Sequence, residues 1–431
     1  EWAATFAGRA AILRAKVQQT DATSPYRPLV TMLREVLNSP LAISLERLPS
    51  VWLAEISQLV PEVGDRRPDL PENLPLPPGP ARDRLLSALT EAFVTLASDA
   101  RPLVIVLDDL HWADDGTLDW LTRFSLRLPE TQCLLVATYR PEAAALDREH
   151  ALNAGPGNLD PQRVDTLSLS PLSVEATTEL LWRMGGTAQP PGQFARRVFA
   201  ETEGNPLFVL ETIRALFDAN YLSATSDGAW AIPLHRHPDD LADLPLPHGV
   251  REAIQSRLSP LSPELADFLG LAAVIGREFE FEVLVNASGQ AEERVLDALA
   301  DLLRARLIRA APASTRFDFG HDKVREVVYQ RIPAAQRRFL HRQVAQALEA
   351  LPEQPHEQRV EMLAYHYSRS DDAPRALKYL VLAAERAETL WTFRTAIAHY
   401  EVASALPAGL ESGDSLPDTF WLEGKRARDG L

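Results

Sequence analysis

Runs of continuous apolar residues alternate with helical patterns through the first 185 positions of the chain. Short apolar runs predict buried strands at 11–17, 103–109, 133–140 and 163–173, the last with period-two alternation. Apolar residues at helical spacing predict helices at 24–37, 82–98, 117–128 and 174–184. Apolar strands separated by helices are typical of a parallel sheet covered on both faces, so this part is predicted to be α/β. The stretch 61–80, rich in proline and charge, is predicted to be a surface loop.

Strand signals become rare after Pro190, and helical patterns dominate. A helix is predicted over Phe194–Ala219, with a break at 204–206, and a loop over Ser223–Pro247. Further helices are predicted at 250–258, 263–275 and 292–304, and two short strands within 307–319 around a turn at 313–315. Three helices followed by a hairpin predict a winged-helix module.

The segment Pro333–Leu406 is rich in alanine and helical in pattern. Within it, AIAHYEVASALP places Ala396, Tyr400 and Ala403 four and then three positions apart, and Pro407 closes the helix. This spacing resembles the second helix of a tetratricopeptide repeat (TPR), where small residues let neighbouring helices approach closely. No clean repeat period accompanies it, so the prediction is a region of TPR-like helical hairpins. The tail at 409–431 has no convincing pattern.

The charge balance argues against nucleic acid as the main partner. The 431 residues include 44 Lys or Arg and 60 Asp or Glu, which gives a formal net charge of −16. Binding to a phosphate backbone depends on clustered Lys and Arg. Residues 250–331, where the winged helix is predicted, hold 11 basic and 13 acidic side chains, a net of −2. We therefore expect no direct DNA binding by this chain.

The composition also indicates the cellular compartment and excludes some kinds of structural site. A hydrophobic share of 46% with 24% charged residues is ordinary for a globular protein. The single cysteine, Cys133, excludes a disulfide framework and a multi-cysteine metal site. No apolar stretch approaches the ~20 residues of a membrane span, and the start of the chain lacks a signal-peptide pattern. We expect a cytoplasmic protein without membrane contact.

Two acids follow an apolar strand in LVIVLDDLHWAD, at Leu103–Asp114. In open α/β sheets, ligands bind in the crevice outside the carboxyl ends of the strands. Asp108 could hold a hydrated Mg²⁺ that bridges nucleotide phosphates, and Asp109 beside it could orient or polarise a water molecule. The alternative is structural: a strand end that runs into a polar turn, with one of the two acids capping the next helix.

A second polar strand end strengthens the nucleotide interpretation. Thr138 and Arg140 end the apolar strand that begins near Cys133. In a parallel sheet this end faces the same crevice as Asp108. There, Thr138 could hydrogen-bond an attacking water and Arg140 could contact a γ-phosphate. Alternatively, Arg140 simply begins a solvated loop before Pro141.

Together these motifs resemble the STAND class of AAA-related P-loop ATPases, found in bacterial LuxR-type and adenylate-cyclase-associated signalling regulators. Four segments between Glu1 and Leu406 carry the resemblance, in the family's order: LVIVLDDLHWAD, LLVATYRPE, EGNPLFVLE and FDFGHDKVREVVY. The resemblance implies an α/β fold with a partial parallel P-loop NTPase sheet, followed by a helical lid, a winged helix and α-helical, TPR-like repeats. The domains expected on this basis are 1–170, 171–245, 246–332 and 333–408, before the tail at 409–431.

The resemblance also implies roles for residues at the strand ends. Asp108 matches the Walker B acid that is associated with Mg²⁺, and Asp109 the neighbouring acid linked to hydrolysis. Arg140 resembles the sensor arginine. The cofactors implied are ATP or ADP with Mg²⁺.

Two further matches concern other parts of the nucleotide. Gly204, Asn205 and Pro206 resemble a glycine–x–proline turn whose proline packs near the adenine. His321 resembles a winged-helix histidine that reaches the β-phosphate of bound ADP. An imidazole beside a phosphate is favoured in its protonated form, so this contact would report a bound diphosphate. The structural alternative is that His321 lies at the start of a helix, with Asp322 as the cap.

One family element has no counterpart in the chain. The phosphate-cradling motif G-x-x-x-x-G-K-[ST] is absent from all 431 residues. Its backbone N–H groups and its lysine normally supply most of the grip on the β- and γ-phosphates. In the family this loop lies one strand and one helix before the strand predicted at 11–17. We expect that a P-loop precedes Glu1 in the parent protein and that the chain alone binds ATP weakly or not at all.

The sequence thus predicts the core of an ATP-binding and ATP-hydrolysing switch in a bacterial transcriptional or cyclase-linked regulator. Such a switch alternates between a closed ADP-bound form and an open ATP-bound form. The resemblance implies protein partners at the C-terminal helices and homo-oligomers in the ATP-bound form. The alternative is a nucleotide-independent scaffold for protein interactions. A direct transcription factor would need a basic helix-turn-helix, which this chain lacks.

Overall fold

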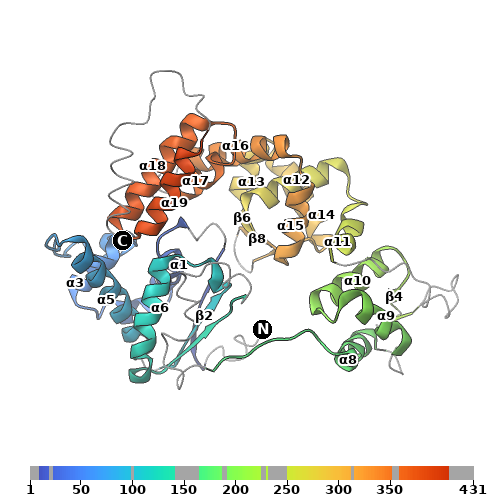
Figure 1. Cartoon of the computed structure of the whole chain (residues 1–431), viewed down its shortest axis with the longest axis horizontal. Helices are drawn as coiled ribbons and strands as arrows, with labels where there is room; N and C mark the ends of the chain where they lie inside the picture. Colours follow the sequence, from blue (N-terminus) through green and yellow to red (C-terminus); the bar gives the residue numbers. More distant parts are fainter. Residues whose placement is uncertain are drawn as a thin grey trace. The chain divides into compact units, whose positions relative to one another are not determined.

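The computed structural model describes residues 9–18, 23–98, 101–140, 165–186, 192–224, 230–231, 250–311, 315–351 and 359–406. The chain divides into two compact units. The first unit combines Glu1–Asp165 with Leu348–Leu431, and the second consists of Thr166–Ala347. Figure 1 shows the elements of both units, coloured along the sequence.

A three-stranded parallel sheet forms the centre of the first unit. Its strands lie in the order β1 (Ala11–Lys16), β2 (Leu103–Asp108) and β3 (Cys133–Ala137). The middle strand, β2, pairs in parallel with both neighbours. Because all three strands run the same way, their carboxyl ends meet at one edge of the sheet. The predicted α/β class with a parallel sheet is confirmed.

Helices pack against this sheet and share one apolar core with it. They are α1 (Arg27–Leu37), α2 (Ala42–Leu45), α3 (Ser50–Ser57), α4 (Glu62–Arg66), α5 (Pro78–Ala97), η3 (Leu110–Trp112), α6 (Asp115–Arg127) and η4 (Leu128–Glu130). Leu13 and Ile105 from the strands are buried together with Phe93 from α5. The ring of Trp120 stacks on Phe124, with their centroids 5.0 Å apart. Burial of these large side chains supplies much of the stabilisation of the unit and holds the strand ends in place.

The C-terminal helices belong to the same unit. They are α17 (Val360–Tyr367), α18 (Ala373–Thr389) and α19 (Phe393–Ser404), which lie side by side (Figure 1). Ala396, Tyr400 and Ala403 are buried, as the TPR-like spacing predicts. The Nε2–H of His399 donates to the backbone carbonyl of Thr23, at 3.0 Å, and so ties α19 to the segment between β1 and α1.

The second unit is mainly helical. Its helices are α8 (Val174–Gly185), α9 (Gly192–Thr202), α10 (Pro206–Asp218), α11 (Val250–Leu258), α12 (Pro263–Ile275), α13 (Phe281–Ser288), α14 (Glu292–Arg304), α15 (Asp322–Arg331) and most of α16 (Ala334–Ala350). Leu181, Val198 and Ile213 form a core shared by α8, α9 and α10. A buried ion pair between Glu211 and Arg257 joins α10 to α11. Among the described residues of the whole chain, no helix is long and apolar enough to cross a bilayer.

Two small antiparallel sheets complete the second unit. β4 (Ser223–Ala224) pairs with β5 (Trp230–Ala231) after α10. The other sheet has the order β6 (Glu278–Glu280), β8 (Arg316–Phe319) and β7 (Ile308–Ala310). In it, Phe279 stacks on Phe317 with centroids 5.8 Å apart, and Phe319 is buried. The β7–β8 hairpin was expected from the sequence; the winged-helix assignment itself stays a prediction.

Some predicted elements are wrong. The described part of the predicted strand at 163–173 forms no strand, and Leu167 and Leu169 are 85% and 93% exposed. Alternation alone does not make a strand when no described strand pairs with it. The predicted loop at 61–80 contains α4 and the start of α5. Pro78 lies in the first turn of α5, where a missing N–H removes no helical bond.

Other differences are omissions from the sequence-based assignment. α13 and β6 lie between two predicted helices and were not expected, and β4 and β5 fall within the predicted loop at 223–247. The predicted turn at 313–315, apart from Thr315, lies outside the described residues, as do the tail at 409–431 and positions 163–164.

Candidate functional site

Asp108 and Asp109 lie at the carboxyl end of the central strand, as predicted. Asp108 is the last residue of β2, and Asp109 has the left-handed conformation φ 59°, ψ 42°. A non-glycine residue in this conformation is uncommon, and such strain often marks a functional site. The two carboxylates are 24% and 19% exposed. Neither acid caps the next α-helix, since Asp114 does so by accepting from the N–H of Thr117.

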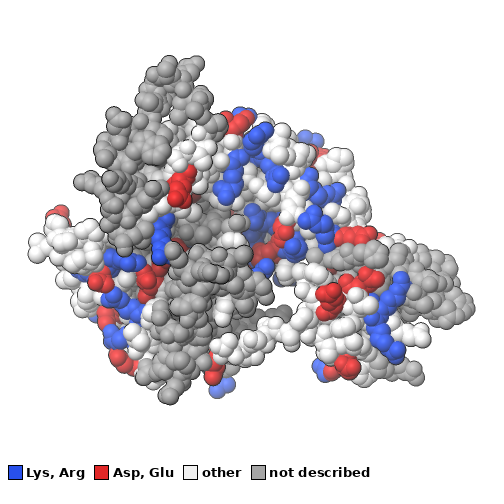
Figure 2. Space-filling model, viewed as in Figure 1, with Lys and Arg blue, Asp and Glu red and all other residues white. Residues whose placement is uncertain are grey.

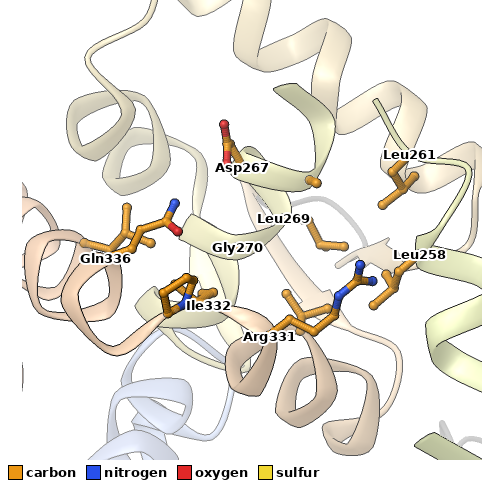
Figure 3. Close-up of a pocket in the computed structure, with 12 residues that line it drawn as sticks. Leu258, Leu261, Asp267, Leu269, Gly270, Arg331, Ile332 and Gln336 are labelled. Carbon is orange, nitrogen blue, oxygen red and sulfur yellow. The ribbon is translucent and has the colours of Figure 1, made fainter. Parts of the chain in front are cut away.

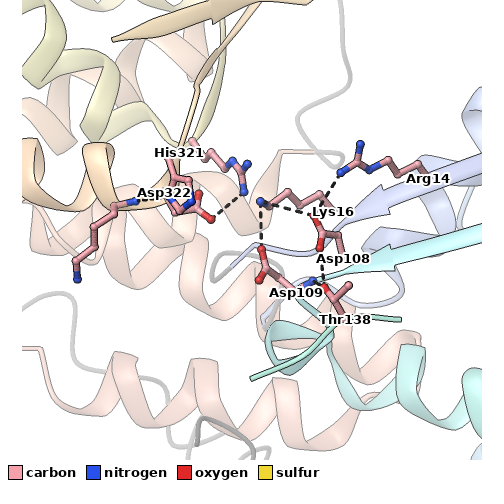
Figure 4. Close-up of polar contacts among 9 residues, drawn as sticks. Arg14, Lys16, Asp108, Asp109, Thr138, His321 and Asp322 are labelled. Carbon is pink, nitrogen blue, oxygen red and sulfur yellow. Dashed lines mark hydrogen bonds and ion pairs between the residues drawn. The ribbon is translucent and has the colours of Figure 1, made fainter. Parts of the chain in front are cut away.

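Thr138 connects the ends of β2 and β3. Its hydroxyl donates to Asp108 Oδ1 at 2.6 Å and accepts the backbone N–H of Asp109 at 3.0 Å (Figure 4). A hydroxyl has a single proton to donate, and here Asp108 receives it. In this arrangement Thr138 positions the two acids. The predicted role, a hydrogen bond to an attacking water, would have to use its remaining acceptor lone pair.

Two basic residues of β1 face the same acids, and the sequence interpretation missed both. Lys16 Nζ lies 3.2 Å from Asp109 Oδ2 and 3.8 Å from Asp108 Oδ2. The guanidinium of Arg14 lies 3.4 Å from Asp108 Oδ2 (Figure 4). A signal was present: Arg14 and Lys16 are two positions apart, hence on one face of a strand, and Lys16 pairs in register with Asp108. That pairing could not be known before the strand order.

Arg140 is less closely involved than expected. It follows β3 by three positions and is exposed, near the edge where β2 ends at Asp108. Within the described part of the chain, no hydrogen bond or ion pair joins Arg140 to either acid. The structure thus brings Asp108, Asp109 and Thr138 together, while Arg140 extends into solvent. A role on a γ-phosphate stays a prediction.

A buried acid, Asp114, lies five residues after Asp109 and links α1 to α6. Asp114 is 2% exposed and accepts from the backbone N–H groups of Tyr26 and Thr117, both at 3.1 Å. Burial raises the pKa of Asp114 to about 6, against the opposing effect of these hydrogen bonds. The contact joins the N-cap residue of α1, Tyr26, to that of α6, Asp114. Gly116 is needed beside it, because a Cβ there would lie 2.5 Å from the ring of Tyr26.

The predicted Gly204–Asn205–Pro206 turn begins α10 in the second unit. Gly204 has φ +73°, and a Cβ at this position would lie 2.0 Å from the carbonyl oxygen of Leu172. Asn205 caps the helix by accepting from the N–H of Leu207 at 3.0 Å, and Pro206 occupies its first turn. Pro206 and Asn205 are exposed and Gly204 is buried. The turn therefore has a complete structural explanation, and contact with adenine stays a prediction.

His321 is the cap of α15. Its Nδ1 accepts from the N–H of Lys323 at 3.4 Å, whereas Asp322 forms an ion pair with Arg277 at 2.8 Å. The structural alternative was right that His321 lies at the start of the helix. It was wrong about the cap, which is His321 and not Asp322. A nitrogen that accepts carries no proton, so a hydrogen bond from His321 to a phosphate would have to come from Nε2. The β-phosphate contact stays a prediction.

A groove in the second unit contains none of the predicted site residues. It lies between α12, α15 and the start of α16, and apolar side chains such as Leu258, Leu269 and Ile332 line it (Figure 3). Asp267, Arg331 and Gln336 supply polar groups to its lining. The lining has a single acid, unlike the pair at the end of β2.

The carboxylate oxygens of Asp108 and Asp109 are suitable ligands for a hard divalent cation. Mg²⁺ prefers oxygen ligands and is commonly held by one or two carboxylates together with substrate phosphates and water. Asp108 and Asp109 supply such carboxylates, both partly accessible. Arg14 and Lys16 balance their charge in this structure and would suit phosphate oxygens equally well.

Comparison with known proteins agrees with a site at the carboxyl end of β2. Residues 1–136 match the AAA ATPase domain family, a segment that contains β1, β2 and both acids. No curated protein matches the chain. Among solved structures, the chain is similar to a signal transduction ATPase with numerous domains (STAND) protein with a tetratricopeptide repeat sensor from Pyrococcus horikoshii. That similarity has 12% identity and a TM-score of 0.34, and covers 98% of this chain and 68% of the other. The AAA-related part of the resemblance is confirmed over residues 1–136.

Proposed function

We propose that the chain is the core of an ATP-binding and ATP-hydrolysing signalling switch of the STAND type. The observation that carries the proposal is the geometry at the carboxyl end of β2. There, two adjacent acids, two cations and the Thr138 hydroxyl meet at one sheet edge, and the acids and cations lie within the segment that matches the AAA ATPase domain family. This is where open α/β sheets bind their ligands.

In this proposal each residue has a distinct task. Asp108 holds Mg²⁺, which neutralises charge on the nucleotide phosphates when it is bound. Asp109 lies close enough to the same edge to orient a water molecule, and Thr138 keeps both carboxylates in place. Arg140 is available in solvent for a γ-phosphate.

The remaining regions fit the signalling part of the proposal. The predicted lid turn at 204–206 and the predicted winged-helix histidine His321 belong to the second unit. Basic and acidic side chains are interspersed on the visible face of that unit, which supports a role other than DNA binding (Figure 2). We place protein partners at α17–α19 and homo-oligomers in the ATP-bound form, within a bacterial transcriptional or cyclase-linked regulator.

Separate measurements of binding and turnover test this proposal in the protein that contains the chain. Asp109→Asn should slow ATP hydrolysis at least about tenfold and leave ATP affinity within a factor of about two, because the amide keeps the shape but not the basicity. Asp83→Asn, on the exposed side of α5, is the control and should change neither. Unchanged turnover in Asp109→Asn would remove this residue from the hydrolytic step.

A nucleotide-independent scaffold is the second candidate, and one observation favours it. Arg14 and Lys16 lie 3.2–3.8 Å from the acids, so the cluster has the composition of a structural ion-pair network. Under this alternative, ATP with Mg²⁺ would not change the thermal stability of the protein.

A further inference from the structure

We infer that Lys16 is an internal counter-ion of the Asp108–Asp109 pair, whose ammonium competes with a divalent cation for Asp108. In this role Lys16 controls how readily a divalent cation occupies Asp108. It rests on the proposed function only in assigning the cation to Asp108.

The position of Lys16 is built into the sheet. It is the last residue of β1 and pairs in register with Asp108, the last residue of β2. Its side chain is 17% exposed, and its ammonium lies between the two carboxylates, 3.2 Å from Asp109 Oδ2 and 3.8 Å from Asp108 Oδ2 (Figure 4). This register brings the ammonium within reach of both acids.

The hydrogen bonds of Asp108 show which oxygen a cation would use. Oδ1 accepts the hydroxyl proton of Thr138 at 2.6 Å, so its position is held by β3. Oδ2 faces Lys16 and Arg14. A divalent cation on Oδ2 would therefore approach two positive side chains, and like charges at such distances repel strongly when the groups are partly shielded from water.

The flexibility of the lysine side chain allows the repulsion between Lys16 and a cation on Asp108 to be relieved. Its charge is a compact ammonium on a flexible four-carbon stem, which can move to another anion without disturbing the strand. A polyphosphate offers such an anion beside Asp108. Phosphate oxygens would draw the ammonium from Oδ2 and supply ligands to the metal. Metal and phosphate are then expected to bind together more tightly than the metal alone.

Arg14 differs from Lys16 in a way that makes it a matched control. It comes from the same strand and the same strand face and contacts the same oxygen, at 3.4 Å. Its side chain is 61% exposed, however, and its ion pair is with Asp108 alone among the described residues. Solvent screening weakens its effect on a nearby cation.

The test is a titration of the nucleotide-free protein with Mn²⁺. The concentration of free Mn²⁺ is measured by electron paramagnetic resonance, and it gives the dissociation constant. We expect weak binding in the wild type. In Lys16→Gln we expect binding about tenfold tighter or more, since removal of an adjacent charge commonly shifts such equilibria by this much. Arg14→Gln should change the affinity less than about threefold. Lys378→Gln, on α18, should not change it. Lys16→Arg, which keeps the charge, should behave as the wild type.

A double variant identifies the ligand. In Lys16→Gln with Asp108→Asn, the gain in Mn²⁺ affinity should disappear. The inference is overturned if Lys16→Gln binds Mn²⁺ no more tightly than the wild type, or if the gain survives the loss of Asp108. Lys16→Met, which keeps the length of the stem, replaces the glutamine variant if circular dichroism shows that the latter is unfolded. Because no nucleotide is present, a failure to bind ATP leaves this result unaffected.

Discussion

The hydroxyl of Thr138 lies 2.6 Å from Asp108 Oδ1 and also accepts the backbone N–H of Asp109 at 3.0 Å. One side chain at the end of β3 thus holds two consecutive acids at the end of β2. The second of these acids has a left-handed backbone, a conformation that needs support from its surroundings. This bond between neighbouring strand ends gives the site its shape.

Removal of the Thr138 hydroxyl should loosen this arrangement. Thr138→Val keeps the side-chain volume but loses both hydrogen bonds, so the free energy of unfolding should fall by about 1 kcal/mol. Thr138→Ser keeps the hydroxyl and should lose much less. Urea unfolding of the three proteins measures the difference, and equal losses in both variants would show that the hydroxyl is not what matters.

Gly204 should be intolerant of a side chain. It has φ +73°, and a Cβ would lie 2.0 Å from the carbonyl oxygen of Leu172, so Gly204→Ala must shift the backbone. Gly289, at φ +63° with nothing within 4 Å, is the matched control. Gly289→Ala should cost only the backbone penalty, about 1–2 kcal/mol. Gly204→Ala should cost clearly more in urea unfolding, and similar losses would contradict the close approach to Leu172.

The buried pair between Glu211 and Arg257 should join α10 firmly to α11. Both side chains are nearly inaccessible, at 1% and 3% exposure, and Arg257 also donates to the carbonyl oxygen of Ala305 at 2.9 Å. Glu211→Gln leaves the buried guanidinium with only Asp218 as counter-charge, a half-exposed acid whose Oδ2 lies 3.4 Å from Arg257 Nε, and should cost about 3 kcal/mol.

An exposed pair on the same unit serves as the control for this loss. Glu179 and Arg183 are 56% and 77% exposed on α8, and Glu179→Gln should change stability little. Thermal unfolding compares the two variants. A small effect of Glu211→Gln would mean that water or another group replaces the lost carboxylate.

Asp114 should make stability depend on pH between its two pKa values. Burial raises the pKa of Asp114 from its ordinary 3.8 to about 6 in the folded chain, so the folded state binds the proton more tightly. The stabilisation is fully present below the lower value and disappears as pH rises through the higher one. Between them, stability relative to Asp114→Asn should fall by about 1.4 kcal/mol per pH unit. Urea unfolding of both proteins at several pH values checks this, and parallel pH profiles would contradict it.

The amino-acid sequence predicted the elements whose signals are local. The apolar run of β2 and its two terminal acids were recognised because burial and charge change abruptly at Asp108. The buried face of α19 followed from the spacing of Ala396, Tyr400 and Ala403. Such patterns depend on one segment at a time.

The missed features depend on partners far away in the sequence. Lys16 became part of the site only through the pairing of β1 with β2, 92 positions later, which no local pattern reveals. Conversely, Leu167 and Leu169 alternate like a strand but have no described partner strand, so they remain exposed. Asp322 looked like the cap of α15, but an ion pair with Arg277 engages it and His321 takes that place.

The most direct test of the strand-end site is the Mg²⁺ dependence of ATP affinity. A fluorescent ATP analogue is titrated with excess Mg²⁺ and again with EDTA, for the wild type and the Asp108→Asn variant of the protein that contains the chain. The asparagine keeps an acceptor for Thr138 but weakens cation binding. In the wild type, Mg²⁺ should tighten binding roughly tenfold, which corresponds to about 1.4 kcal/mol. In Asp108→Asn the two titrations should coincide. A variant that keeps the full Mg²⁺ dependence would contradict the assignment of the metal to Asp108.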